Sequence, residues 1–164
     1  MTAGDEPAVP RHDRVLQGGR SKAYRPLPPE ARRAAFDAGL AAYRRGDFFE
    51  AHELLEPAWM GTADAAERDL YQGLIKLAAA YVHAVRGNPL GVGTNLRGAR
   101  ERLASAAASD SRVGGLDLPA LIAAIDVRLQ RGPATAIARP LSDAPGLTSA
   151  VGSGPVSHGP SRGS

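Results

Sequence analysis

The sequence predicts an all-α fold, a compact bundle of about five helices that are mostly antiparallel. Three observations lead to this prediction. Apolar residues recur every three or four positions through the middle of the chain, which is the spacing of amphipathic helices. Capping residues stand before these segments, and Gly or Pro stands after them. No segment shows the alternation of apolar and polar residues that is typical of strands.

The first helix is predicted over residues 29–45. Pro28 precedes it, and Gly46 suits its end because glycine adopts the backbone conformation of a helix C-cap without strain. The second helix begins after Asp47, with Glu50 three residues further on. This spacing is that of a capping box, so Glu50 is assigned to the helix start.

The third helix repeats this arrangement with Asp64 and Glu67, and it is predicted to continue to Arg86, where Gly87 closes it. Apolar residues occupy more than one side of this helix. A helix of that kind lies at the centre of its bundle. The third helix is therefore expected to contact most of the others.

Asn88 and Pro89 cap and open the fourth helix, and Asp117 caps the fifth. The connections between the helices are short, which favours antiparallel neighbours. Gly39, Ala51 and Ala58 also match the small positions of a tetratricopeptide helix pair, where two helices approach closely. The match covers one unit, so it predicts a tetratricopeptide-like hairpin and not a repeat array.

The composition divides the chain into three parts. Residues 1–28 lack a periodic apolar pattern and are interpreted as a flexible N-terminal arm, residues 29–131 as the helical domain, and residues 132–164 as a disordered tail. The tail is rich in Gly, Ser, Pro and Ala. Such a composition buries too little apolar surface to offset the entropy lost on ordering.

Charge and composition exclude several classes of function. The chain of 164 residues carries a net charge of +3, but residues 29–131 hold thirteen basic and thirteen acidic residues, so the predicted domain is neutral. A nucleic-acid binder more often carries a basic face on the domain itself, so nucleic-acid binding is not expected. The absence of cysteine excludes disulfides and thiolate metal sites.

The expected location is the cytoplasm. No apolar run approaches the roughly 20 residues that a membrane span requires. The first residues lack the basic-then-apolar order of a secretory signal. No membrane association is predicted.

The second and third helices carry polar residues where an apolar face is expected. His52 shares a face with Phe48 and Leu55, and the motif HELLE places Glu56 four residues from His52, within contact distance. Antiparallel packing brings the third helix alongside. The predicted polar cluster consists of His52, Glu53, Glu56, Gln72 and, at its far end, His83.

Three interpretations of this cluster stay open. Imidazole and carboxylate groups bind zinc, iron or manganese, so His52 and Glu56 are candidate metal ligands, and a carboxylate beside a histidine also serves as a general acid or base. The motif lacks the second histidine of the HExxH helix of zinc proteases. The simpler interpretation is a buried hydrogen-bonded network that fixes the packing of two helices. The third is a pocket for an unknown ligand.

The segments GDFFEAHELLEPAW, ERDLYQGLIKLAAAYVHAVRGNPLGV and LRGARERL together resemble the domain of unknown function 309 family. The resemblance covers residues 35–103. It implies a small all-helical domain of bacteria and archaea without an established activity. The polar positions that it carries over are the five residues of the cluster together with Trp59 and Asn88. Two departures are Lys76, where an amide is common, and Pro57 inside the second helix.

Two functions from different classes follow from these observations. The first is a non-enzymatic module that self-associates or binds a protein partner, with the polar network in a structural role and no cofactor. The alternative is a metal-binding protein or metal-dependent hydrolase that uses the HELLE helix to hold a divalent ion. Whether the protein is an enzyme is left undecided, with the incomplete catalytic set favouring a non-enzyme.

Overall fold

The computed structural model describes residues 14–17, 20–23 and 25–150, and it confirms the all-α class of the bundle. The helices are α1 Pro29–Arg44, α2 Phe48–Gly61, α3 Ala65–Val85, α4 Pro89–Ser109, α5 Leu118–Arg131, α6 Pro133–Ala138 and α7 Pro140–Asp143, with one 3₁₀ turn at Val113–Gly115. The five predicted helices are α1 to α5.

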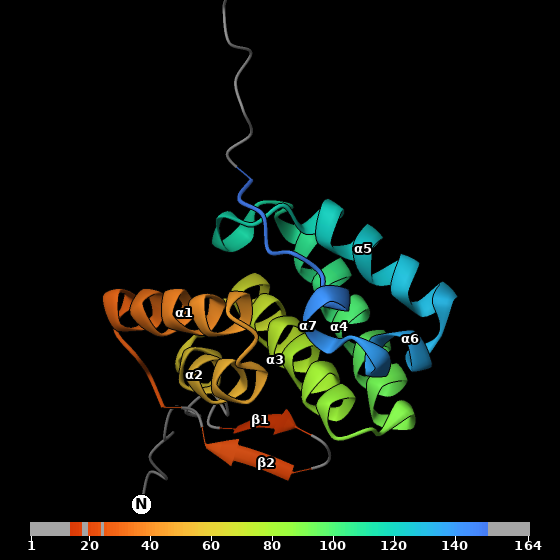
Figure 1. Cartoon of the computed structure of the whole chain (residues 1–164). Helices are drawn as coiled ribbons and strands as arrows, with labels where there is room; N and C mark the ends of the chain where they lie inside the picture. Colours follow the sequence, from red (N-terminus) through yellow and green to blue (C-terminus); the bar gives the residue numbers. More distant parts are fainter. Residues whose placement is uncertain (1–13, 18–19, 24, 151–164) are drawn as a thin grey trace, which may run out of the picture.

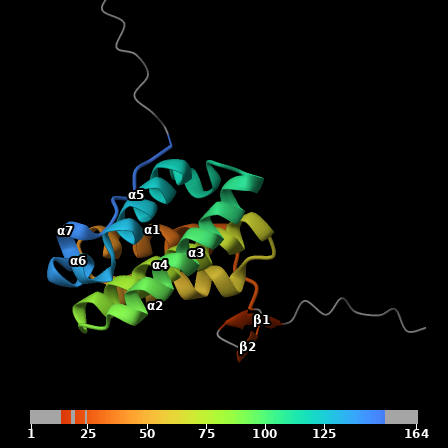
Figure 2. The same ribbon diagram turned by 90° about the vertical axis from the view of Figure 1, so that its right-hand side faces the viewer.

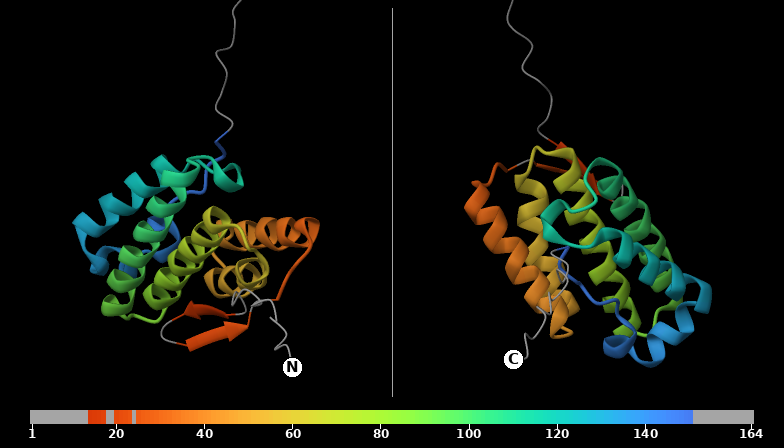
Figure 3. Two further views of the ribbon diagram at one scale, coloured as in Figure 1. Left: turned by 180° about the vertical axis from the view of Figure 1, so that it is seen from behind. Right: turned by 90° about the horizontal axis from the view of Figure 1, so that it is seen from above.

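Each long helix packs against the next one along the chain, and α3 lies at the centre (Figure 1). Helix α3 contacts α2, α4, α6 and α7. The view from above shows α1 to α4 following one another across the molecule (Figure 3). The central place predicted for the third helix is therefore observed.

Burial along α3 explains this position. Leu70, Leu77 and Tyr81 are fully buried on one side, and Ile75 is buried on another. Val85, which continues the first apolar stripe in the sequence, is instead 67% exposed because it is the last residue of α3. The exposed Val85 becomes part of a surface groove described below.

Side-chain caps fix the starts of four helices at the positions that the sequence indicates. The side chains of Asp47, Asp64, Asn88 and Asp117 each accept a hydrogen bond from the backbone N–H three residues further on. Such caps satisfy one of the N–H groups that a helix start leaves without an intrahelical partner. The positions of α2 and α3, which carry the candidate site, therefore follow from local chemistry.

The α1–α2 hairpin has the close approach expected of a tetratricopeptide-like pair. A Cβ atom added at Gly39 would lie 2.6 Å from Leu55 Cγ, so any side chain there would collide. Ala51 and Ala58 of α2 are fully buried. Small residues at these places let the two helix backbones come together.

Two short strands, β1 Arg14–Gln17 and β2 Arg20–Ala23, pair in antiparallel fashion within the predicted N-terminal arm. They lie outside the helices (Figure 2). The following residues dock onto the end of α2, where the N–H of Arg25 donates to Met60 O at 3.1 Å and that of Leu27 to Gly61 O at 3.1 Å. Residues 1–13 of the arm lie outside the described residues.

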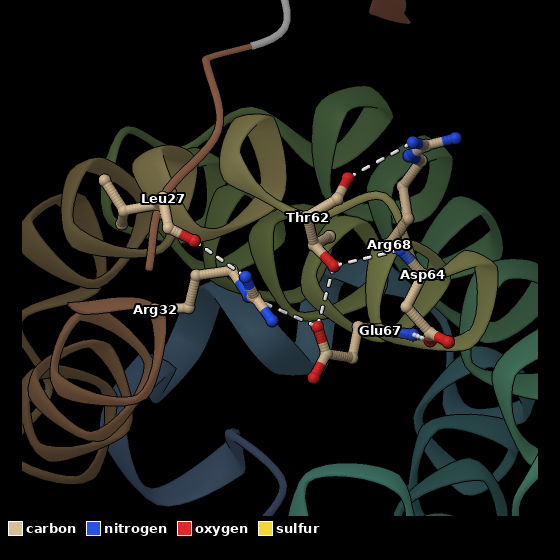
Figure 4. Close-up of polar contacts among 6 residues, drawn as sticks. All are labelled: Leu27, Arg32, Thr62, Asp64, Glu67 and Arg68. Carbon is tan, nitrogen blue, oxygen red and sulfur yellow. Dashed lines mark hydrogen bonds and ion pairs between the residues drawn. The ribbon is translucent and has the colours of Figure 1, made fainter. Parts of the chain in front are cut away.

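Polar contacts hold this docked segment at the turn between α2 and α3 (Figure 4). Arg32 donates to Leu27 O at 2.7 Å, and its Nε lies 3.5 Å from Glu67 Oε2. Thr62 donates to the same Glu67 oxygen at 2.7 Å, while Arg68 donates to Thr62 O at 3.2 Å. The arm thus has a defined attachment to the bundle from Arg25 onward.

The packed part of the chain extends beyond the predicted boundary at residue 131. Residues 132–150, assigned to the tail by composition, contain α6 and α7 and return to the core, where Ala136 and Leu147 are buried. Tertiary contacts offset the cost of ordering a segment whose composition alone would not. Residues 151–164 lie outside the described residues, so a disordered tail there stays a prediction.

None of the helices in the described part of the chain is both long and apolar enough to cross a membrane.

Candidate functional site

Helix α2 presents its polar residues on the side away from the core. Its buried face is made of Ala51, Leu55 and Trp59, which hold the helix against α1 and α3. His52 and Glu56 are partly buried at the edge of that face, and Glu53 is exposed. The four-residue spacing places His52 and Glu56 on adjacent turns of the helix.

The structure brings His52, Glu53 and Glu56 together. Each offers one potential ligand atom, and these atoms lie within 4.8 Å of one another. The His52 Nδ1 and Glu53 Oε1 atoms are 3.2 Å apart. If Nδ1 carries the hydrogen of a neutral ring, it donates to this carboxylate and leaves the Nε2 lone pair available to a ligand.

This cluster is more open than the predicted network. The side chain of Glu53 is 54% exposed and that of His52 is 26% exposed, so the prediction of a buried network does not hold for Glu53. An exposed pair of this kind is screened by solvent and contributes little to stability. The two side chains are accessible to a solute.

A groove runs beside the cluster between α2 and α3. Its first hollow has a volume of about 200 Å³. The lining residues are Phe49, His52, Glu53, Ala79, Val82, His83 and Arg86. The groove thus unites His52 and Glu53 of α2 with His83 of α3, as the antiparallel register of the two helices predicts.

A second hollow of about 280 Å³ continues the groove toward the start of α2. The two hollows share Phe49, Val82 and Arg86. Phe49 is 59% exposed, and Val85 lines the second hollow. The groove therefore has apolar walls and one basic residue at the junction of its two parts.

His83 is oriented by the cap of α4. Asn88 Oδ1 accepts from the N–H of Gly91 at 3.1 Å, which fixes the amide so that Nδ2 faces His83 Nδ1 at 3.2 Å. An amide nitrogen only donates, so Nδ1 accepts and a neutral His83 ring carries its hydrogen on Nε2. A Cβ at Gly91 would lie 2.5 Å from His83 Nδ1, so only glycine leaves room for the ring.

Three predicted residues lie apart from the groove lining and from the three-residue cluster, namely Gln72, Trp59 and Asn88. Gln72 of α3 is buried, with 6% of its surface exposed. Trp59 is fully buried in the core, and its indole nitrogen has no hydrogen-bond partner within the described residues. Trp59 therefore supports the packing of α2, and Asn88 acts through His83.

The sequence analysis did not identify Arg86, Phe49 and Val85 as groove residues. Val85 and Phe49 fit apolar helix stripes, and Arg86 marks only the expected end of the third helix. Phe49 lies at the start of α2, and Val85 and Arg86 lie at the end of α3. An antiparallel register places these two helix ends side by side, and that register could have identified the three residues.

A second polar region was also missed, and it is buried. The Tyr81 hydroxyl donates to Asp143, with Oδ2 at 3.1 Å and the backbone O at 3.2 Å, and Arg128 Nε donates to the same backbone O at 2.6 Å. The Tyr43 hydroxyl donates to Pro145 O at 2.9 Å. These contacts tie α7 and the residues after it to α1, α3 and α5.

Burial dominates the electrostatics of this region. It raises the pKa of Tyr43 well above the usual value of 10.0, and the neighbouring Tyr81 raises it further. Burial also raises the pKa of Tyr81, and the charge of Asp143 adds to this increase. Both hydroxyls are held in their neutral, donating form because the charged form would lose hydration and face a carboxylate.

Comparison with known proteins covers the whole of the first region and, in the second region, Tyr43 and Tyr81. Residues 36–94 match the model of a family described as "Domain of unknown function (DUF309)". The predicted resemblance is thereby confirmed. The DUF309 match includes the three-residue cluster, Gln72 and all the residues that line the groove, whereas Arg128 and Asp143 lie beyond it. No curated protein and no solved structure is similar enough to the chain to count as a match.

Proposed function

We propose that the DUF309-like region binds a divalent transition-metal ion at His52, Glu53 and Glu56. The observation that supports this most directly is the approach of three potential ligand atoms to within 4.8 Å of one another. Ligands around one ion at about 2.0–2.2 Å are separated by no more than about 4.4 Å. Small rotations of these surface side chains would therefore suffice.

The chemistry of the three groups favours zinc, iron or manganese over calcium, because imidazole suits the transition metals. We assign His52 and Glu56 as ligands. Glu53 lies 3.2 Å from His52 Nδ1 and orients the ring as a carboxylate partner does in many histidine-metal sites. The roles of Glu53 and Glu56 are therefore distinguishable by experiment.

The groove beside the cluster gives the proposed ion an open side. Structural zinc sites are closed by four protein ligands, whereas sites that act on a ligand keep a position for water or substrate. Two protein ligands leave further positions on the ion to water or a solute, and a hollow of about 200 Å³ lies beside His52, so the proposed site is open. The proposal is a metal-binding protein with an accessible ion, and it assigns no reaction.

The test is metal analysis of protein purified without an affinity tag, followed by zinc and manganese titration of the metal-free protein. His52→Ala and Glu56→Gln should weaken binding by more than the roughly 10- to 100-fold that an orienting partner contributes, and Glu53→Gln by about that factor. Glu50→Gln is the matched control on the same helix, because Glu50 pairs with Arg45.

Equal metal affinity in wild type and His52→Ala would contradict the proposal. The proposal would also be contradicted if the purified protein held less than one metal ion per chain and the wild type bound zinc no more tightly than His52→Ala and Glu56→Gln do. Equal losses in Glu53→Gln and Glu56→Gln would overturn the assignment of separate roles while keeping the site.

The second candidate function is self-association or the binding of a protein partner, and a different observation favours it. Phe49 and Val85 are large apolar side chains with more than half of their surface exposed, and both line the second hollow. Exposed apolar residues that gather in one place are typical of interaction surfaces. Binding of a second copy here would cover the groove.

Sedimentation of the purified protein over a concentration series tests this candidate. A dimer that dissociates in Phe49→Ser and Val85→Ser, but not in a variant of the exposed Leu141 on α7, would support it. A monomer at all concentrations would exclude self-association at this surface. A cytoplasmic location and the absence of nucleic-acid binding stay predictions.

A further inference from the structure

We infer that the α2–α3 groove binds a small organic anion, a carboxylate or a phosphate monoester with an apolar body. The anionic group is held by Arg86 and His83, and the apolar body lies against Phe49, Val82 and Val85. The inference goes beyond metal binding, and it stands on residues of α3 that the proposed metal site does not use.

The charged groups that line the groove differ in whether they already have a partner within the protein. Asp47 accepts a hydrogen bond from the N–H of Glu50 at 3.2 Å, and Glu53 lies 3.2 Å from a nitrogen of His52. The Arg86 side chain makes no hydrogen bond and no ion pair with any of the described residues. The Asp47 and Glu53 carboxylates thus already interact within the chain, whereas the Arg86 guanidinium has no such partner in the part of the chain that the structure describes.

His83 has one ring nitrogen left for a ligand. Its Nδ1 is occupied by the Asn88 amide, whose orientation is fixed by the N–H of Gly91. The neutral ring therefore carries its hydrogen on Nε2, the only ring nitrogen left for a ligand. His83 lines the same hollow as Arg86, which is the C-cap of α3, and the two are three residues apart, so both face the same side. Two donors with no fixed acceptor favour an anion.

The anion would lie where the two hollows meet. Arg86 lines both hollows, whereas Glu53 lines only the first and Asp47 only the second. The junction of the hollows is thus the position at which an anion meets Arg86 with the least repulsion from the two carboxylates. A guanidinium group binds carboxylate and phosphate alike, through paired N–H donors.

The apolar body of the ligand would lie in the second hollow. Phe49, Val82 and Val85 line the hollow of about 280 Å³ that continues from Arg86. This volume is below the usual range for drug-sized ligands, so a short chain or a single ring is the size that fits. An apolar body placed there would cover two side chains, Phe49 and Val85, that are otherwise more than half exposed.

The experiment uses the full chain in its metal-free form and follows backbone amide shifts and binding heats with defined probes. Hexanoate and hexyl phosphate test the two anionic groups, acetate tests the apolar body, and hexylamine tests the charge. Each methylene that becomes buried should raise affinity by about fourfold at most. We expect hexanoate or hexyl phosphate to bind at residues 46–53 and 79–86, acetate to bind more weakly, and hexylamine not to bind.

Arg86→Gln should weaken binding of the better anion by about tenfold, which is the loss of one charge-assisted hydrogen bond, and Arg86→Lys should recover part of it. Arg131→Gln is the matched control, since Arg131 is an exposed arginine at the end of α5. Unchanged binding in Arg86→Gln, or equal binding of hexanoate and hexylamine, would overturn the inference. Circular dichroism of each variant confirms that it is folded.

The outcome is separable from that of the metal proposal. Anion binding by metal-free protein that depends on Arg86 supports the inference even where zinc does not bind to His52. Zinc binding without any anion binding, in metal-free or zinc-loaded protein, supports the metal site and overturns the inference. A ligand that binds only to zinc-loaded protein and ignores Arg86 also overturns it.

Discussion

The α2–α3 groove and the Tyr43–Tyr81–Asp143 region both contain polar side chains, but these side chains differ in burial and in hydrogen bonding. In the second region, each hydroxyl donates to an oxygen of the C-terminal segment, and the residues are buried. In the groove, His52, Glu53 and Arg86 keep part of their polar surface open to solvent. The hydroxyls of the tyrosine region thus have partners within the chain, whereas the polar groups of the groove are accessible to a ligand.

The two regions differ in how much their polar groups contribute to the stability of the fold. A buried polar group costs free energy unless it is hydrogen-bonded, so the C-terminal network is explained by its own contacts. The groove residues gain little stability from one another because water screens them. The proposed ligand binding would account for their gathering in one hollow, and the following variants test the contrast between the two regions.

The largest effect is expected at Asp143. Asp143→Ala leaves the buried Tyr81 hydroxyl with only the backbone oxygen as acceptor and opens space in the core, so the free energy of unfolding should fall by about 2–3 kcal/mol. Urea denaturation followed by circular dichroism measures this change. Asp37→Ala is the control, because Asp37 forms an exposed pair with Arg33 and should change stability by about 0.5 kcal/mol or less. Similar losses in the two variants would show that the region around Asp143 is not a buried network.

A smaller loss is expected for Tyr81→Phe. The ring and its packing against Phe48 are retained, and only the hydroxyl that donates to Asp143 is removed. The expected cost is about 1–2 kcal/mol, since the buried carboxylate loses its donor. Combining the change with Asp143→Ala should cost less than the sum of the two, because both remove the same hydrogen bond. Strict additivity would show that the two side chains are not coupled.

Alkaline pH should weaken the same region without any mutation. The pKa values of Tyr43 and Tyr81 are raised in the folded state, so above about pH 10 the folded protein holds protons that the unfolded chain has lost. The stability is present in full below pH 10 and falls as pH rises through the folded values. Thermal unfolding from pH 8 to 11 measures this fall. Tyr43→Phe and Tyr81→Phe should flatten the pH dependence, and an unchanged slope in both would contradict this explanation.

The smallest effect is expected in the groove. Glu53→Gln should change the free energy of unfolding by about 0.5 kcal/mol or less, because its side chain is more than half exposed. His52→Ala should also cost less than the core variants do. The same chemical denaturation experiment serves for all four positions. A loss above about 2 kcal/mol in Glu53→Gln would indicate a structural network after all, and the contrast between the two regions would disappear.

Much of the fold was predictable from local signals. The capping residues Asp47, Asp64, Asn88 and Asp117 each act at the predicted helix start, because a cap depends on atoms only three residues away. The close approach at Gly39, where an added Cβ would collide with Leu55, was predictable from the tetratricopeptide-like pattern of small residues in the first two helices. The i, i+4 spacing of His52 and Glu56 likewise follows from helix geometry alone.

The site was predictable only in part. The sequence placed His52, Glu53, Glu56 and His83 in one neighbourhood, and the antiparallel register brings three of them to a shared hollow. It did not predict how exposed Glu53 would be, because exposure depends on which neighbours cover a side chain. Gln72 belongs to the same helical sequence motif, yet it lies buried in α3 outside the groove lining.

The sequence by itself determined helices α1 to α5, the caps of α2 to α5 and the polar residues that α2 and α3 carry, because these depend on interactions within a few residues. Tertiary structure alone decided which polar groups are buried and hydrogen-bonded and which are exposed. Asp143 is the only acidic residue in 132–164. The residues around it do not indicate that it accepts a hydrogen bond from Tyr81, which lies 62 positions earlier in the chain. The free energy that orders residues 133–150 comes from burial against distant helices, and a composition that resembles a tail cannot reveal it.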